Sequence, residues 1–175
     1  GMSVGVTVVG GCRSAMMAAM LTATFRRALI ATLAVLAVAL LGEYDPESVI
    51  DMICASLEEQ FNVPHVTMRL WPKTGALAGR AEFTDVSQEI KEFTVAMNAP
   101  YCGQHAVYEV DHWFGEAASH LRSFALIPLK RDDVFGLLVL ASEDAARFYP
   151  EMGTLYLHRL SELASVALLR ALRKT

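Results

Sequence analysis

The stretch 123–153, SFALIPLKRDDVFGLLVLASEDAARFYPEMG, decides the fold. Two apolar runs of strand length, 123–130 and 134–141, flank a tight polar break around Asp132. A polar break between two such runs predicts a β-hairpin. A polar corner and a Phe-Tyr-Pro follow, and an amphipathic helix is then expected from about 150 to 173. This order predicts an antiparallel sheet with helices packed across it.

Both strands of the hairpin are apolar at nearly every position. An antiparallel sheet with one face in water alternates apolar and polar residues, so both faces of these strands are expected to be covered. The segment 63–71 does alternate, and it predicts a further strand with one apolar and one polar side. Its apolar side carries Val66, Met68 and Leu70, and its polar side carries His65, Thr67 and Arg69.

Capping signals predict two helices before this strand. The first is expected from about 13 to 41, because Gly42 follows in the position favoured just past a helix end. The second begins after Asp45, since an acidic cap and a proline in the first turn, here Pro46, both favour a helix start. Cys54 lies on the apolar stripe of this second helix and is expected to be a small core residue.

The region between the strand and the hairpin is less regular. Residues 87–97 predict a third helix with Ser87 as its cap. A short strand is expected at 81–84, and 98–103 breaks the chain with a proline and a glycine.

Length and composition favour one domain and exclude nucleic-acid binding. The 175 residues suffice for a full core with an added helical arm. Fifteen basic and 19 acidic residues give a net charge of -4 without a basic stripe, so the charge pattern of nucleic-acid binding is missing. The three cysteines are far apart and match no zinc spacing, so a zinc site is not expected. No other metal and no cofactor is predicted. Free thiols favour a cytoplasmic location.

We expect three regions along the chain. Residues 1–12 begin with Gly1, which is typical of a cleaved expression tag, and continue with a Gly/Val-rich stretch that is expected to be disordered. Residues 13–42 form an apolar helical arm, and 43–175 form the main domain.

The segment 28–41, ALIATLAVLAVALL, carries no charge. It is shorter than the roughly 20 residues of a membrane-spanning helix. Leucines recur along it at helical spacing, which predicts a packing seam. The seam consists of Leu29, Leu33, Leu36 and Leu40. An interface helix is therefore expected, and membrane association is the alternative.

The order of elements resembles the GAF-type sensory fold, and the segments 136–142 and 160–165 resemble its last strand and final helix. Several motifs more closely resemble DUF484, an uncharacterised bacterial GAF-like family. These motifs are Cys102-Gly103, Phe114-Gly115, Pro128-Leu129, Gly136-Leu137-Leu138 and RFYPEMGT at 147–154. The resemblance covers about 44–172, because relatives carry a more polar, coiled-coil-like helix in place of the first forty residues.

The resemblance implies an α+β fold. It is a GAF-like antiparallel sheet with N- and C-terminal helices packed on one face and loops or a short helix over the other. GAF domains bind small ligands between the sheet and its variable loops, and they commonly dimerise through their first and last helices. A homodimer formed through helices near 28–41 and 155–172 is therefore implied. No particular chemistry is implied, because the activity of the family is unknown.

The segment 100–105 contains the best site candidate. It brings the phenol of Tyr101, the thiol of Cys102 and the imidazole of His105 to one loop. A Cys/His pair supports nucleophilic or redox chemistry where the imidazole lowers the pKa of the thiol, so Cys102 is the one candidate catalytic residue. The alternative is that Cys102 packs beneath the loop and Gly103 makes a positive-φ turn.

Arg69, Trp113 and Phe114 complete the expected ligand pocket, with Arg69 as the partner of an anion. The alternative is that the polar side of strand 63–71 faces solvent. We expect a cytoplasmic sensory or regulatory domain that signals by binding a small molecule or a protein partner. One alternative is a thiol-based reductase of the free methionine sulfoxide type that uses Cys102. Another is a structural interaction module with a filled pocket, which predicts no cavity beneath 100–115.

Overall fold

The computed structural model describes residues 10–72, 77–150 and 155–173, with side chains from residue 26 onward. A four-stranded antiparallel sheet lies at its centre, in the order β1-β4-β3-β2. The strands are β1 His65–Leu70, β2 Tyr101–Gly103, β3 Ser123–Lys130 and β4 Val134–Ser142. The expected α+β fold is confirmed.

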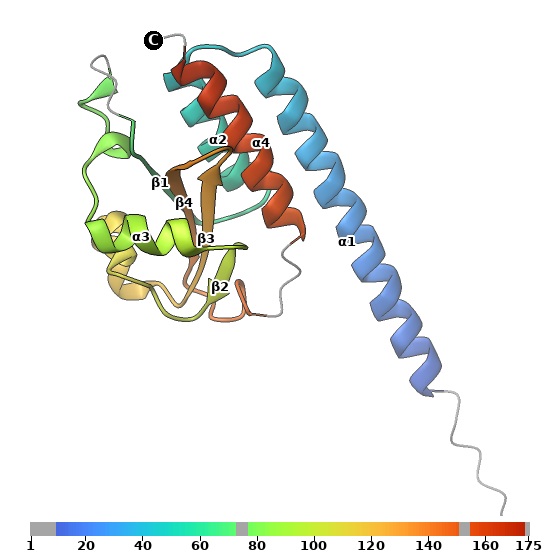
Figure 1. Cartoon of the computed structure of the whole chain (residues 1–175). Helices are drawn as coiled ribbons and strands as arrows, with labels where there is room; N and C mark the ends of the chain where they lie inside the picture. The colour runs from blue at the N-terminus through green and yellow to red at the C-terminus, as the bar shows by residue number, and fades with distance from the viewer. Residues whose placement is uncertain (1–9, 73–76, 151–154, 174–175) are drawn as a thin grey trace, which may run out of the picture.

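Helices cover both sides of this sheet (Figure 1). The side covered by α1 Gly10–Leu41, α2 Pro46–Glu59 and α4 Leu155–Leu172 is called the first face. The other side, the second face, is covered by α3 Gln88–Ala96 and by the 3-10 segment η3 Val110–His120.

The β3–β4 hairpin has the doubly covered strands that its sequence predicts. Ile127 pairs with Leu138, Leu126 pairs with Val139, and all four side chains are 0% exposed. The first pair belongs to the core of the first face and the second pair to the core of the second face. The sheet therefore separates two apolar clusters.

The predicted cap starts α2, and a side-chain hydrogen bond ties α4 to the sheet. The Asp45 carboxylate accepts a hydrogen bond from the Ser48 amide at 2.9 Å, and Pro46 lies in the first turn of α2. From α4, the Ser161 hydroxyl donates to the Pro128 carbonyl at 2.5 Å. Pro128 lies beyond the part of β3 that pairs with β2, where a missing N–H costs no ladder hydrogen bond.

The leucine seam of α1 packs against helices of its own chain. Leu36 and Leu40 are buried in the first-face core together with residues of α4 and α2, and Leu33 is partly buried there. Figure 1 shows α1 running alongside α4 and continuing past the domain. No helix among residues 10–72, 77–150 and 155–173 is long and apolar enough to cross a membrane.

Two element predictions were wrong, and one helix start is shifted. The expected strand at 81–84 is a 3-10 turn, η2 Ala81–Phe83, whose Phe83 is buried in the first-face core. The break at 98–103 contains strand β2, which forms because its three residues pair with 124–126 of β3. Helix α1 begins at Gly10, before the expected start at about 13. The predicted disorder at 1–9 lies outside the described residues. The closing helix was expected from about Pro150, which lies in a turn, and 151–154 are outside the described residues.

Candidate functional site

The polar side of β1 lies on the second face, beneath η3. His65, Thr67 and Arg69 pair with Ala141, Val139 and Leu137 of β4, three members of the second-face core. Side chains of paired residues lie next to each other on the same face of a sheet, so the three polar side chains lie beside apolar side chains of β4. Trp113 and Phe114 of η3 pack against the same cluster from above. The structure thus buries Arg69 and partly covers His65 and Thr67, on the side of β1 that one sequence interpretation placed in solvent.

Arg69 is the most enclosed of these polar residues, with 8% of its surface exposed. Its Nη1 donates to the Thr67 hydroxyl at 3.1 Å and to the Met68 carbonyl at 2.9 Å. Its guanidinium carbon lies 4.8 Å from the centre of the Trp113 ring, within cation–π range. Burial lowers the pKa of Arg69, and the charge of Glu82 partly opposes that shift. Arg69 and Trp113, both predicted for the pocket, are therefore in contact.

His65 forms the other end of this row. Its Nε2 lies 2.6 Å from Oε1 of Glu143, and its ring meets Phe114 edge to face at 6.2 Å. The hydrogen bond from His65 is the main cause that lowers the pKa of Glu143. Phe114, predicted for the pocket, thus contacts the polar side of β1 as Trp113 does.

A second cation and a second tryptophan extend the row beyond Arg69. Trp71 follows Arg69 by two residues and packs against the second-face core. The Nζ of Lys91, from α3, lies 5.9 Å from the centre of the Trp71 ring. Both tryptophans of the chain therefore lie beside a cation on this face. The sequence analysis passed over Trp71 and Lys91, although Trp71 continues the alternation of β1.

The structure does not bring Tyr101, Cys102 and His105 together. Tyr101 packs against the second-face core, whereas Cys102 belongs to the first-face core. Burial raises the pKa of the Cys102 thiol to about 11. His105 is exposed, and no interaction with the thiol is found for it among the described residues. Cys102 packs inside the protein, as the alternative interpretation had it.

Gly103 does not form the positive-φ turn that the sequence suggested. It is part of β2, and a Cβ atom at this position would overlap the Tyr101 hydroxyl and ring. Among the described glycines, Gly115 alone has a positive φ, of 58°. A larger residue at 103 would therefore require the Tyr101 ring to move.

Cys54 is partly buried against the first-face core, as its helical stripe predicts. Burial, followed by the charges of Glu82, Glu58 and Asp51, raises the pKa of its thiol to about 12. The side chain of Cys12 lies outside the described residues. No group of three metal-ligating side chains is found in the part of the chain that the structure describes.

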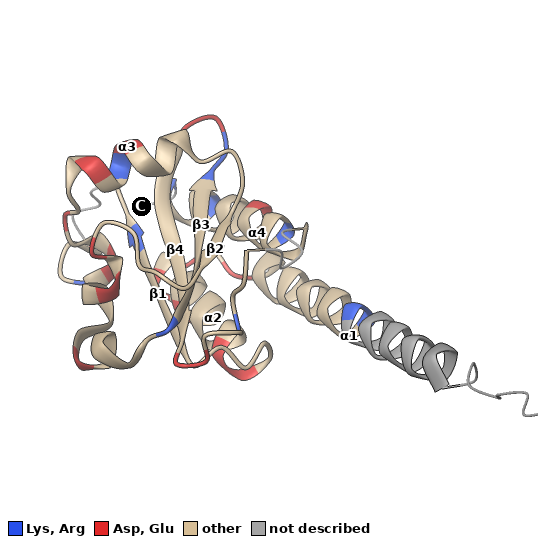
Figure 2. Cartoon of the chain, turned by 90° about the horizontal axis from the view of Figure 1, so that it is seen from below, with Lys and Arg blue, Asp and Glu red and all other residues tan. Residues whose placement is uncertain are grey.

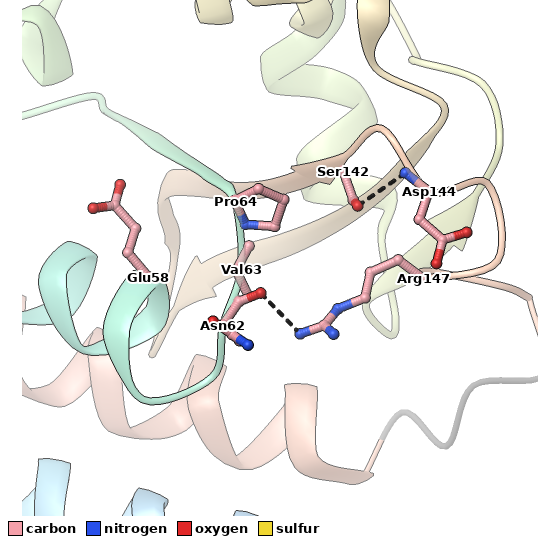
Figure 3. A pocket seen from close by; sticks show the side chains of 7 residues that line it. All are labelled: Glu58, Asn62, Val63, Pro64, Ser142, Asp144 and Arg147. Carbon is pink, nitrogen blue, oxygen red and sulfur yellow. Dashed lines mark hydrogen bonds between the residues drawn. The ribbon is translucent and has the colours of Figure 1, made fainter.

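Two surface hollows accompany these features. The larger, of about 330 Å³, lies at the corner after β4, and five of the seven residues that line it are polar (Figure 3). Its Arg147 donates to the carbonyls of Phe61 and Asn62 at 2.6 and 3.3 Å, so it ties this corner to the end of α2. The smaller, of about 280 Å³, lies between α3 and β2 and includes Tyr101. Neither hollow is lined by Arg69 or Trp113.

The sheet order, with helices on the first face and η3 on the second, defines a GAF-like domain. Comparison with known proteins then gives the family. The model of a protein of unknown function, DUF484, matches residues 12–171, and the chain belongs to this family. The match includes α1 from residue 12 onward, which the sequence resemblance had left out.

Solved structures show the same fold. The chain is similar to the free methionine-R-sulfoxide reductase from Neisseria meningitidis in complex with its substrate, at 19% identity and a TM-score of 0.58. That match covers 82% of this chain and 90% of the reductase. The chain is also similar to the GAF domain of the potassium sensor histidine kinase KdpD from Escherichia coli, at 16% identity and a TM-score of 0.52. This match covers 82% of the chain and 94% of the GAF domain. No curated protein matches.

Proposed function

We propose that this chain is a sensory or regulatory domain that binds a small molecule on the second face of the sheet, beneath η3. The observation that carries the proposal is the buried Arg69, beside the partly buried Thr67, under this short cover. The first face of β1, by contrast, presents apolar side chains. Enclosed polar groups are stabilised by hydrogen-bonding partners, which a ligand under η3 supplies.

A thermal-shift screen of the whole chain against a small-molecule library tests this function. A ligand is expected to raise the melting temperature, because it binds the folded state only. The rise should shrink in Thr67→Val and in Trp113→Leu, and persist in Val95→Ala, which changes an exposed residue of α3. If no molecule stabilises the protein, or if both site variants respond like the wild type, the proposal fails. The structural module with a filled pocket predicts the first of these outcomes.

We further propose that the domain is a homodimer formed through its terminal helices. The seam of α1 is used within the chain, but its other side is apolar and exposed, with Ile30, Val35, Val38 and Leu41 between 58 and 70% exposed. Leu155 and Val166 of α4 are exposed as well. Figure 2 shows no charged residue on α1 between the arginines at 26–27 and its C-terminal end. Such an apolar stripe is typical of an interaction surface.

Light scattering after gel filtration tests the dimer. The wild type is expected to elute at twice the chain mass, and Val38→Glu at the mass of one chain. Val95→Glu, on the exposed side of α3, should remain dimeric. A monomeric wild type, or one that partitions into detergent micelles through α1, would contradict the dimer; the second result would favour membrane association.

The reductase alternative finds no support in the position of its thiol. Cys102 lies on the opposite face of the sheet from Arg69 and Trp113, and the pKa of its thiol is raised. A nucleophilic cysteine needs a lowered pKa and access to the substrate. We therefore propose binding without thiol chemistry.

A further inference from the structure

Arg69 carries a charge that the protein around it leaves without a direct counter-ion. No ion pair of Arg69 is found among residues 10–72, 77–150 and 155–173, although it is nine-tenths buried. Glu82 is the acidic group whose charge acts on it, but the carboxylate of Glu82 binds Arg80, at 3.1 Å. Buried charges are normally paired, so this arrangement requires a reason.

The donor atoms of Arg69 show where a partner fits. A guanidinium has five N–H donors, and Nη1 uses its two on Thr67 and Met68. Within the described residues, no hydrogen bond is found for Nε or Nη2. These two nitrogens form one edge of the guanidinium, and such an edge binds a carboxylate or phosphate group through two parallel hydrogen bonds.

The cover over Arg69 is bounded by backbone in unusual conformations. Segment η3 is preceded by two non-glycine residues in the left-handed region, Tyr108 at φ 51° and Glu109 at φ 60°. It is also kinked at Gly115, where φ is 58° and ψ is -126°. Residues in sparsely populated conformations are frequent in segments that clamp ligands. Trp113, which lies over the guanidinium, belongs to the part of η3 between these two points.

We propose that Arg69 binds the oxyanion of a small organic anion, a carboxylate or a phosphate group, through its Nε and Nη2 edge, while Trp113 stays against the guanidinium. The inference rests on the proposed small-molecule site beneath η3 and names the chemical class of its ligand. Trp71 lies next along β1 with the Lys91 ammonium over its ring. Together they offer an aromatic surface and a second positive charge to the body of the anion.

Tryptophan fluorescence of the whole chain tests this ligand class directly, because both tryptophans flank Arg69. The probes are inorganic phosphate and benzoate, added at constant ionic strength with chloride as the reference. A saturable change in emission is expected with at least one of the two. A response to phosphate alone assigns a phosphate group, and a response to benzoate alone assigns a carboxylate.

Variants of Arg69 and Trp113 test whether the fluorescence response arises at this site. Arg69→Gln is expected to abolish the response, and Arg69→Lys to weaken it about tenfold or more, because an ammonium lacks the paired donors. Arg131→Gln, in the exposed hairpin turn, is the matched control and should respond like the wild type. Trp113→Phe leaves Trp71 as the reporter and should bind more weakly, since the smaller ring forms a weaker cation–π contact and holds the guanidinium less firmly. If Arg69→Gln does not fold, Arg69→Lys and Trp113→Phe decide the question.

Two outcomes would overturn the oxyanion assignment. One is the absence of any saturable response to either probe, and the other is a response that both Arg69 variants keep unchanged. If neutral molecules raise the melting temperature of the wild type but not of Trp113→Leu, the site beneath η3 is supported and only the proposed ligand class is wrong. If they do not, the proposed function falls with it.

Discussion

Tyr101 and Cys102 are neighbours in β2, and their side chains leave the sheet on opposite faces. Tyr101 pairs with Leu126 of the second-face core, and Cys102 pairs with Ala125 of the first-face core. Side chains alternate along a strand, so pairing with β3 separates the phenol and the thiol that the sequence places side by side. The candidate site is therefore centred on β1 and η3.

The buried thiols are expected to be slow to react. With a pKa of about 11 for Cys102 and about 12 for Cys54, the thiolate of Cys102 is about one part in a thousand at pH 8, and that of Cys54 is rarer still. A Cys12→Ser variant leaves only these two thiols. Titration with a disulfide reagent should show no fast-reacting thiol in the folded variant at pH 8 and two in denaturant. One fast, stoichiometric thiol at pH 7 would contradict the burial of Cys102 and revive the reductase.

Space at Gly103 is expected to matter for stability. Gly103→Ala places a methyl group against the Tyr101 ring and should lower the free energy of unfolding by about 1–3 kcal/mol. Gly79→Ala is the matched control, because a Cβ there meets nothing within 4 Å, and it should change stability by less than about 0.5 kcal/mol. Urea denaturation measures both changes.

A double variant isolates the cause. In a Tyr101→Ala background, Gly103→Ala should cost clearly less than it does in the wild type, because the overlapping ring is gone. An equal cost in both backgrounds would show that the alanine acts on the backbone of β2 instead.

Most of the fold could be predicted because each main helix or strand shows a signal in its own local sequence. The apolar 123–130 and 134–141 runs, the Asp45 cap and the alternation of 63–71 each depend on neighbouring residues only. Strand β2 has three residues, too few to show an alternating pattern, and it exists because β3 offers an edge. The sequence also could not predict what the α1 seam packs against, since leucines at helical spacing fit a neighbouring helix of the same chain or of another.

The site could be predicted only in part, for a related reason. The alternation of β1 places the side chains of Arg69 and Met68 on opposite faces of the sheet. The sequence does not say whether the face that carries Arg69 is covered. The cover depends on where η3 crosses the sheet, and this is set by tertiary packing of Trp113 and Phe114. The face on which Cys102 lies depends on its register with Ala125, and a shift of one residue would reverse it.

The contact between His65 and Glu143 should give stability a dependence on acid pH. The hydrogen bond from His65 holds the pKa of Glu143 below its usual value in the folded state. The stabilisation is therefore complete above the unfolded pKa of about 4.3 and is lost as the pH falls through the lower folded pKa. Between pH 6 and pH 3 the melting temperature of the wild type should fall more than that of Glu143→Gln. Parallel curves for the two proteins would show that the contact contributes nothing.

Arg170 joins the end of α4 to the end of α1, and its loss should loosen α1. Its guanidinium donates to the carbonyls of Leu40, Leu41 and Glu43 and lies 4.5 Å from the centre of the Tyr44 ring. A helix end leaves such carbonyls without partners of their own. Arg170→Gln should lower the free energy of unfolding by about 1–3 kcal/mol and speed amide hydrogen exchange in the last turn of α1.

The control for Arg170 is another arginine of the same helix. Arg159→Gln removes an exposed ion pair with Glu162, of 2.7 Å, and should change stability by less than about 0.5 kcal/mol. Arg170→Lys should lie between the two variants, because one ammonium cannot reach three carbonyls in the geometry of a guanidinium. If Arg170→Gln leaves exchange in α1 unchanged, the buried Leu36 and Leu40 alone hold this helix on the domain. In that case Leu36→Ala, which removes buried side-chain volume from the seam, should release it where Arg170→Gln does not.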